Sequence, residues 1–201
     1  IYRYFILNPN DDKDDLLLRI QRISEIAIFT IAFITLYFNF LKPSKIKLKT
    51  GKKTILLWHD NALNLSPMLD LFCSVINNGA KSRLIDSFQI KLIKKNTETI
   101  TSFEDFLFLK NIDGNKWIME NYSYPVFIDK YSSRSFMIGF RNRDINYCFS
   151  VGNYLLKINA LEYNKIVAMD SCEFELTENN FKEIKEKKDN KNNEAVEIML
   201  K

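Results

Sequence analysis

The chain contains one histidine, His59, which directly precedes Asp60, and a His–Asp pair suggests general acid–base catalysis. Neighbouring residues of a strand point to opposite faces, however, so these two side chains cannot act as a relay. No serine stands in a GxSxG turn that would make it a nucleophile. We therefore interpret His59 as a packing or surface residue, and we predict that the protein is not an enzyme.

Three arginines, Arg134, Arg141 and Arg143, surround a predicted strand and form the best candidate for an anionic-ligand face. Nucleotide binding has less support, since the chain has only 5 glycines and neither a GxGxxG nor a P-loop motif. The clustered acids lack the glycine-containing loop of a calcium site, and we expect them on solvated strand faces. These acids are Glu104, Asp105, Asp170, Glu173 and Glu175. The sequence therefore predicts no cofactor and no metal ion.

The three cysteines follow no CxxC or CxxH spacing and predict neither a disulfide framework nor a zinc site. Cys73 and Cys172 alternate with their neighbours as buried strand residues do, so we expect them to be small core residues. The third cysteine is Cys148. Extracellular domains more often carry paired cysteines, so this odd number favours an intracellular body.

The segment Ile26–Leu41 contains no charged residue and is the one stretch of this chain that suits a lipid bilayer. Its 16 residues span about 24 Å as a helix, slightly less than a hydrocarbon core of about 30 Å. Thr30 and Thr35 are tolerated there because hydroxyl groups can bond back to helix carbonyls. We predict one helix over 12–41, amphipathic first and membrane-embedded later. A helix packed in the domain core or on a partner, and an uncleaved signal sequence, are the alternatives.

The net charge of +4 is concentrated beside this segment. Residues 42–53 carry +6, whereas residues 54–181 carry −2. A nucleic-acid-binding protein carries its positive charge on the folded domain, so we expect no nucleic-acid partner. The charge instead predicts a membrane-surface anchor on the cytoplasmic side, formed by Arg22, Lys42, Lys45, Lys47 and Lys49. The alternating lysines also suit the solvent face of an edge strand.

After the lysines, the hydrophobic period changes from that of a helix to the two-residue period of strands. About nine strands are predicted, with a strong turn signal at 77–79. They cover 45–48, 54–58, 69–76, 84–93, 100–109, 126–128, 135–140, 152–158 and 166–176. The sequence thus predicts a mainly β protein, in which an N-terminal transmembrane helix precedes an antiparallel immunoglobulin-like β-sandwich. In such sandwiches a tyrosine can bond back to the corner backbone, and Tyr154 is a candidate for this role, with Leu156 and Ile158 on the same face. The alternative is an ordinary strand with an interfacial tyrosine.

Four regions follow from these patterns. They are an N-terminal segment with the hydrophobic helix at 1–41, a lysine-rich linker at 42–53, a β-sandwich at 54–181 and a charged tail at 182–201. Within the tail, Ala195–Leu200 has the pattern of a last strand or a short helix. The chain begins at Ile1 rather than methionine, which leaves room for an upstream element.

Four stretches of the sequence resemble one class of proteins. They are FLKPSKIKL, INNGAKSRLIDSFQIKL, VGNYLLKI and CEFELTENNF. Together they look like small bacterial membrane-anchored immunoglobulin-like proteins of unknown function, over residues 24–181. The resemblance implies an anchor and a β-sandwich, and it transfers no catalytic residue.

Two functions are compatible with these predictions. The first is a non-enzymatic interaction or scaffold module, held by a single span in a bacterial cell membrane, whose partners are the lipid bilayer and an unidentified protein. The alternative is a sensor or effector subunit that binds a small molecule in the sandwich and signals through the helix. The 16 Phe and 9 Tyr residues would then line a pocket, whereas core packing is the simpler explanation for them.

Overall fold

The computed structural model divides the chain into two compact units, Ile1–Pro43 and Ser44–Lys201, which we call the anchor unit and the body. The structure describes residues 9–60, 65–111, 117–144, 146–190 and 195–201. Side chains are described over the same residues except 9–15, 58–60, 65, 111 and 117.

The anchor unit consists of α1 (Pro9–Leu36), which continues into the π-helical turn η1 (Tyr37–Leu41). The predicted helix over 12–41 is therefore confirmed, and it begins three residues earlier than expected. Thr30 and Thr35 donate hydroxyl hydrogen bonds to the carbonyl oxygens of Ile26 and Ile31, at 2.7 and 2.8 Å. These bonds satisfy the two hydroxyl groups within the helix, as the sequence predicted.

The hydrophobic part of this helix is longer than the predicted 26–41. Leu16–Leu41, 26 residues with a mean hydropathy of 1.7, is long and apolar enough to cross a membrane. None of this segment is buried.

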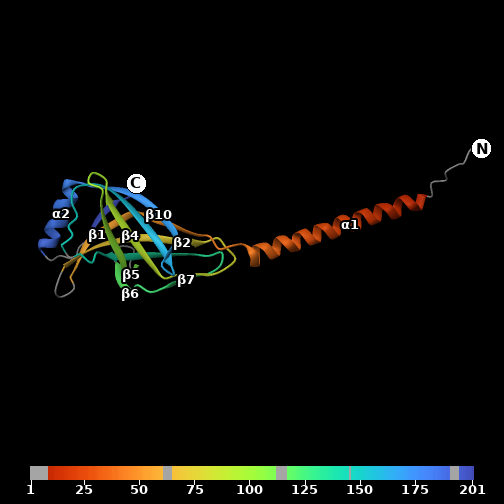
Figure 1. The fold of residues 1–201 in the computed structure, drawn as a ribbon, viewed down its shortest axis with the longest axis horizontal. Coiled ribbons are helices and arrows are strands. Elements are labelled where there is room, and N and C mark those ends of the chain that lie inside the picture. Colours follow the sequence, from red (N-terminus) through yellow and green to blue (C-terminus); the bar gives the residue numbers. More distant parts are fainter. Residues whose placement is uncertain (1–8, 61–64, 112–116, 145, 191–194) are drawn as a thin grey trace, which may run out of the picture. The chain divides into compact units, whose positions relative to one another are not determined.

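Over its described residues, the body contains eleven strands and one helix (Figure 1). The strands are β1 (Ile46–Asp60), β2 (Leu65–Asn77), β3 (Arg83–Ile85), β4 (Ser87–Lys94), β5 (Thr99–Asn111), β6 (Trp117–Tyr122), β7 (Val126–Ile128), β8 (Ser133–Arg141), β9 (Gly152–Glu162), β10 (Lys165–Leu176) and β11 (Val196–Met199). The helix α2 (Glu178–Asp189) follows β10. It begins with a capping box, in which Thr177 and Asn180 satisfy each other's backbone N–H groups.

Nine strands form one antiparallel sheet in the order β10-β9-β4-β5-β8-β2-β1-β11, with β6 paired to the second half of β5. β3 and β7 form a separate two-stranded sheet. The last residues of the described chain join the two ends of the large sheet. Leu200 donates its N–H to Lys52 at 2.8 Å, and Lys201 exchanges two backbone hydrogen bonds with Glu173, at 2.7 and 3.2 Å. The mainly β prediction is confirmed, whereas a division into two immunoglobulin-like sheets is not.

Two of the predicted regions, the lysine-rich linker and the charged tail, are part of the folded body. The linker at 42–53 is mostly part of β1, because Ile46 and Leu48 are buried between exposed lysines and pair with β2. The tail at 182–201 contains most of α2 and all of β11, in which Val196 and Ile198 are buried. The body therefore extends beyond the predicted 54–181 on both sides.

The core lies on one face of the large sheet and is built from alternate residues of its strands. Its largest fully buried side chains include Phe88, Phe103, Phe140, Phe149 and Phe174. The core cluster contains only residues between Ile46 and Ile198. Because the body buries this core without the anchor unit, it has the properties of an independently folding domain.

Tyr154 closes one corner of the core as predicted. Its hydroxyl donates to the Ser150 carbonyl at 2.6 Å and accepts from the Ser150 N–H at 3.2 Å. Tyr154, Leu156 and Ile158 are all buried on the core face of β9.

Candidate functional site

The outer face of β4, β5, β9 and β10 carries a groove of about 620 Å³, which lies opposite the core. This volume lies within the range of about 300–1,000 Å³ that is typical of small-molecule sites. We call it the outer groove. It is lined by Lys91, Ile93, Ile100, Lys157, Asn159, Ile166, Met169, Asp170 and Ser171.

Two lysines stand side by side on the floor of the outer groove. Lys91 of β4 and Lys157 of β9 are direct cross-strand partners, and Ser171 of β10 is the next partner of Lys157. Side chains at such positions start about 4.5–5.5 Å apart at Cβ, and like charges placed there are destabilising. The two ammonium groups therefore create a local positive field that their own strands do not neutralise.

Other charged side chains near these strands form ion pairs within the body. On the same sheet, Lys95 pairs with Glu173 at 2.5 Å, and Arg143 pairs with Glu104 at 2.6 Å. Among the described residues, neither Lys91 nor Lys157 forms an ion pair or a side-chain hydrogen bond. An anion bound in the groove would supply a counter-charge to this pair.

Asn159 adds a polar side chain to the groove. It lies two residues beyond Lys157 on β9, faces the groove and is only 6% exposed. Within the described part of the chain its side-chain amide has no hydrogen-bond partner. A side-chain amide can both donate and accept hydrogen bonds, so Asn159 can bind a polar group of a ligand.

Apolar side chains border this polar floor. Ile100, Ile166 and Met169 are 62%, 51% and 67% exposed, which is unusual for side chains that surround one concavity. Asp170 also lines the groove, but its Oδ2 already accepts from the Thr50 N–H and hydroxyl groups, at 2.8 and 2.9 Å. The groove thus combines two cations and an amide with apolar margins, an arrangement that suits an amphipathic anion.

The sequence did not reveal this site. Lys91 and Lys157 lie on different strands, and only the pairing of β4 with β9 makes them neighbours. The one local signal is the placement of each lysine between core residues, in QIKLI and LLKIN, which puts both on the outer face.

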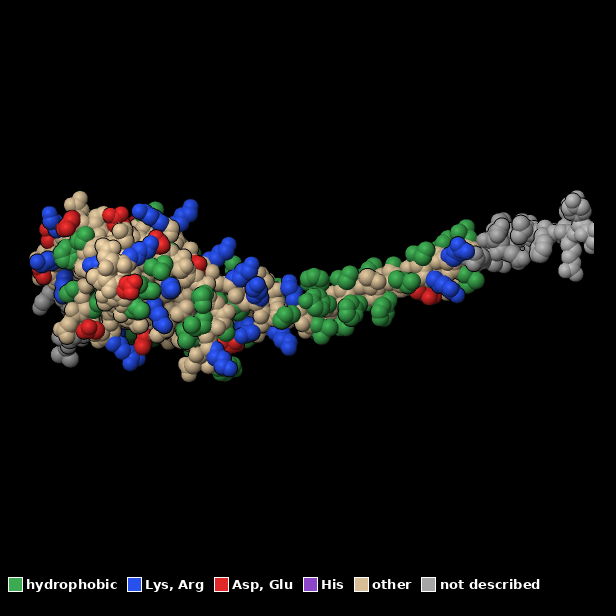
Figure 2. Space-filling view, turned by 45° about the horizontal axis from the view of Figure 1, so that its top comes forward, with side chains coloured by type: hydrophobic (Ala, Val, Ile, Leu, Met, Phe, Trp, Pro, Cys, Tyr) green, Lys and Arg blue, Asp and Glu red, His purple; other side chains and the backbone are tan. Residues whose placement is uncertain are grey.

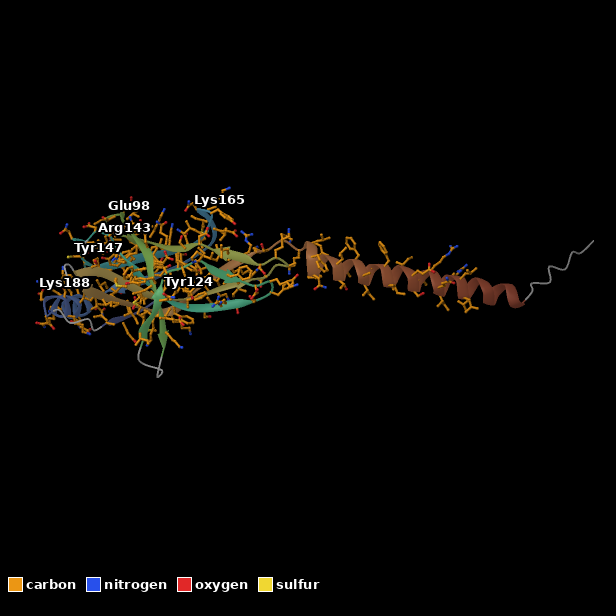
Figure 3. All side chains as sticks on the ribbon, turned by 90° about the horizontal axis from the view of Figure 1, so that it is seen from below. Glu98, Tyr124, Arg143, Tyr147, Lys165 and Lys188 are labelled. Carbon is orange, nitrogen blue, oxygen red and sulfur yellow. The ribbon has the colours of Figure 1, made fainter. Side chains whose placement is uncertain are left out.

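The three arginines that the sequence selected do not form one ligand face. Arg134 and Arg141 lie at opposite ends of β8 and differ by an odd number of residues, so they point to opposite faces. The Arg134 guanidinium lies 5.4 Å from the centre of the Phe136 ring, and that of Arg141 lies 4.2 Å from the centre of the Phe106 ring. Arg143, labelled in Figure 3 near Glu98 and Tyr147, forms the ion pair described above.

The predicted membrane-surface residues fall in both units. Arg22 lies on α1, and the Lys42 ammonium is 5.2 Å from the centre of the Phe38 ring. Lys45, which precedes β1, and Lys47 and Lys49, which belong to it, are all exposed. The alternation that predicted an edge strand is therefore present, and in the described sheet this part of β1 pairs with β2, whereas β11 pairs only with residues 53–56.

The remaining sequence candidates are the His59–Asp60 pair, the cysteines and the clustered acids. His59 and Asp60 lie in β1, but their side chains fall outside the described residues. Cys73 and Cys172 are buried as predicted, and burial raises the pKa of both thiols. The predicted acids include Asp105, which accepts a hydrogen bond from the Ser123 hydroxyl. Over the described residues, no cluster of three His, Cys, Asp or Glu side chains suits a metal ion.

No family model and no curated protein matches this chain. Among solved structures, the chain is similar to Spo0M, a sporulation control protein from Bacillus subtilis, with 11% identity and a TM-score of 0.32 over 70% of this chain and 56% of that one. It is also similar to a β-glucosidase involved in saponin metabolism from intestinal bacteria, with 12% identity and a TM-score of 0.27 over 62% of this chain and 16% of that one. The chain thus spans about half and about a sixth of these proteins, and such weak likeness carries no functional conclusion.

Proposed function

We propose that this protein is a single-pass membrane protein whose body binds an amphipathic anion in the outer groove, without catalysing a reaction. The observation that carries the proposal is the cross-strand pair of Lys91 and Lys157, neither of which forms an ion pair among the described residues. The exposed apolar margin of the groove supports a ligand with a hydrocarbon part. The hydrophobic segment Leu16–Leu41 supports the membrane anchor by its length and composition.

The test uses the body, Ser44–Lys201, and alkyl carboxylates from hexanoate to dodecanoate. Isothermal titration calorimetry should show affinity that rises up to about fourfold per added methylene, because each one buries further apolar surface. The double variant Lys91→Met/Lys157→Met should lose this binding, whereas Lys182→Met on α2 should retain it. Lys182 is exposed and belongs to a different element, so it controls for the loss of positive charge alone.

Two results would count against the groove. Equal affinity for the alkyl carboxylates and for the matching alkyl alcohols would show that the lysines do not recognise charge. Equal weakening by the Lys182 variant would show that net charge, rather than the groove, attracts the anion.

A protein-interaction function is the second candidate, and β6 favours it. Among the described strands it pairs only with β5, and its residues Ile118, Met119 and Tyr122 are 40%, 46% and 62% exposed. An edge strand with such side chains can accept an extended segment of another protein. Crosslinking from a photoreactive residue at position 119 tests this function, and crosslinks to lipid alone would contradict it.

The cytoplasmic orientation and the immunoglobulin-like fold family remain proposals. Cys148 is exposed, whereas the other two cysteines are buried, so a membrane-impermeant thiol reagent reports the location of the body through this one residue. Modification of Cys148 only after the inner membrane is opened is expected. Modification in cells with only the outer envelope opened would reverse the orientation.

A further inference from the structure

Four connections of the body meet at one end, around the start of β1, and we call this end the entry face. They are the first residues of the body at 44–45, the β2–β3 connection at 78–82, the β7–β8 connection at 129–132 and the β9–β10 turn at 163–164. Only Lys42 and Pro43 lie between the hydrophobic helix and the body. The first residues of the entry face, 44–45, therefore follow the hydrophobic helix almost directly in the sequence.

Asn77 fixes two of these connections. Its side chain is fully buried, and its Nδ2 donates to the Lys81 and Asp129 carbonyls at 2.8 and 3.1 Å. Its Oδ1 accepts from the Gly79 N–H at 3.0 Å, and its backbone N–H donates to Ser132 at 2.8 Å. Asn77, which begins the predicted turn at 77–79, thus also positions the β7–β8 connection.

Arg83 holds the other two connections, at 44–45 and 163–164. Its Nη1 donates to the Ser44 hydroxyl at 2.8 Å, and its Nε donates to Glu162 at 3.1 Å, next to the β9–β10 turn. This ion pair is partly buried and bidentate, because Nη2 also contacts the Glu162 carboxylate. The four connections are therefore held together by side-chain hydrogen bonds and form one surface.

Each of two connections presents a tyrosine in an unfavourable backbone conformation. Tyr131 and Tyr163 have φ values of 51° and 50°, and they are 45% and 76% exposed. Tyr163 is the first of two residues in a tight turn, and the second, Asn164, has a φ of 59°. Glycine, asparagine or aspartate adopts this left-handed conformation at lower cost. An exposed tyrosine at such a position is best explained by a use of its side chain.

Basic side chains surround the two tyrosines. Exposed residues of the same connections and strand ends are Lys45, Lys81, Lys130, Arg134 and Lys165. The acids there are fewer: Glu162 is neutralised by Arg83, Asp86 accepts the Tyr163 N–H, and Asp129 is exposed. Lys and Arg side chains gather visibly over this end of the body in Figure 2, and Figure 3 labels Lys165 well away from Lys188 on α2. The entry face is thus positive and carries two exposed aromatic rings.

We propose that the entry face docks on an anionic phospholipid bilayer, with Tyr131 and Tyr163 at the headgroup level and the basic residues against the lipid phosphates. Tyrosine favours the membrane–water interface because its ring is apolar and its hydroxyl polar. Lysine and arginine near an anionic surface each strengthen binding. This inference rests on the membrane anchor of the proposed function and is independent of the outer groove.

The experiment measures flotation of the body, Ser44–Lys201, with vesicles of phosphatidylcholine alone and of phosphatidylcholine with phosphatidylglycerol. We expect binding to the anionic vesicles only. Lys130→Gln/Lys165→Gln should weaken it by about fivefold per lysine, or about 25-fold together. Lys182→Gln/Lys185→Gln on α2 is the matched control and should leave binding unchanged.

The aromatic contribution is tested by Tyr131→Ser/Tyr163→Ser, with Tyr122→Ser on β6 as the control for an exposed tyrosine elsewhere. Far-UV circular dichroism checks that each variant is folded. Loss of binding in the first variant and retention in the second supports the proposal. The proposal would be overturned if the lysine variant and its control, or the tyrosine variant and its control, weakened vesicle binding equally. It would also be overturned if the body bound neutral and anionic vesicles equally well.

Flotation of the full chain separates this proposal from the membrane anchor. If the full chain floats with vesicles while the body does not, the docking surface is wrong and the anchor stands. If the full chain fails to float, the anchor itself is wrong.

Discussion

Replacing Asp70 by asparagine should make the body more stable at neutral and alkaline pH. Asp70 lies on the outer face of β2, opposite Gly139 of β8, and is only 8% exposed. Its Oδ1 has no hydrogen-bond partner among the described residues. Burial without a partner disfavours the charged carboxylate and raises its pKa from 3.8 to about 7.

The sign of the effect follows from the proton affinities. Folded Asp70 binds a proton more tightly than unfolded Asp70, so the stability of the folded state falls as the pH rises through the range between the two pKa values. The loss is complete above about pH 7 and absent below about pH 4. A pKa that moves from 3.8 to about 7 corresponds to a total of about 4 kcal/mol, at about 1.4 kcal/mol for each tenfold change in affinity.

Urea unfolding of the body, with and without Asp70→Asn, measures this difference. The asparagine side chain has nearly the shape of the protonated acid but does not titrate. The stability advantage of the variant should therefore grow by about 3 kcal/mol between about pH 5 and pH 8. Other groups, among them Asp105, whose pKa burial also raises, titrate in both proteins and cancel in the comparison. The matched control is Asp129→Asn, because Asp129 is exposed.

A stability difference that stays constant with pH would refute the reasoning. It would mean that water or a neighbouring group stabilises the Asp70 carboxylate in the folded state. An equal pH dependence in the Asp129 variant would also refute it, since the effect would then arise from net charge rather than from burial.

Three further outcomes are expected. Gly139→Ala should destabilise the body by about 1–3 kcal/mol in urea unfolding, because a Cβ would lie 2.8 Å from Leu107 Cδ1 and 3.0 Å from Asp70 Oδ1; an unchanged midpoint would show that these side chains move aside. Lys91→Met/Lys157→Met should stabilise the ligand-free body by about 0.2–1 kcal/mol through relief of like-charge repulsion, and a loss of stability would contradict the repulsion. A thiol reagent should modify one cysteine of the native body and three after denaturation, as mass spectrometry would show, because only Cys148 is exposed.

The side-chain orientation along each strand could be predicted from the sequence. The alternation of Lys45–Lys49, the burial of Cys73 and the corner hydrogen bond of Tyr154 all follow from the two-residue period and local turn chemistry. The long helix could also be predicted, because its apolar composition is a property of one continuous segment.

Strand boundaries were less predictable where pairing decides them. β6 was missed because Trp117–Tyr122 has no clear alternation and is a strand through its contact with β5. The lysine-rich linker became part of β1 because β2 offers a long partner for it. Local propensity is weak, and a neighbouring strand overrides it.

The sequence by itself determined which residues face inward and which segment is apolar enough for a membrane. The tertiary structure decided which outward residues meet. The pairing of β4 with β9 brings Lys91 beside Lys157, the fold buries Asp70 on the outer face, and Asn77 with Arg83 gathers four distant connections at the entry face. The physical reason is that the period of a strand is a local property, whereas strand partners are chosen by contacts between residues far apart in the chain.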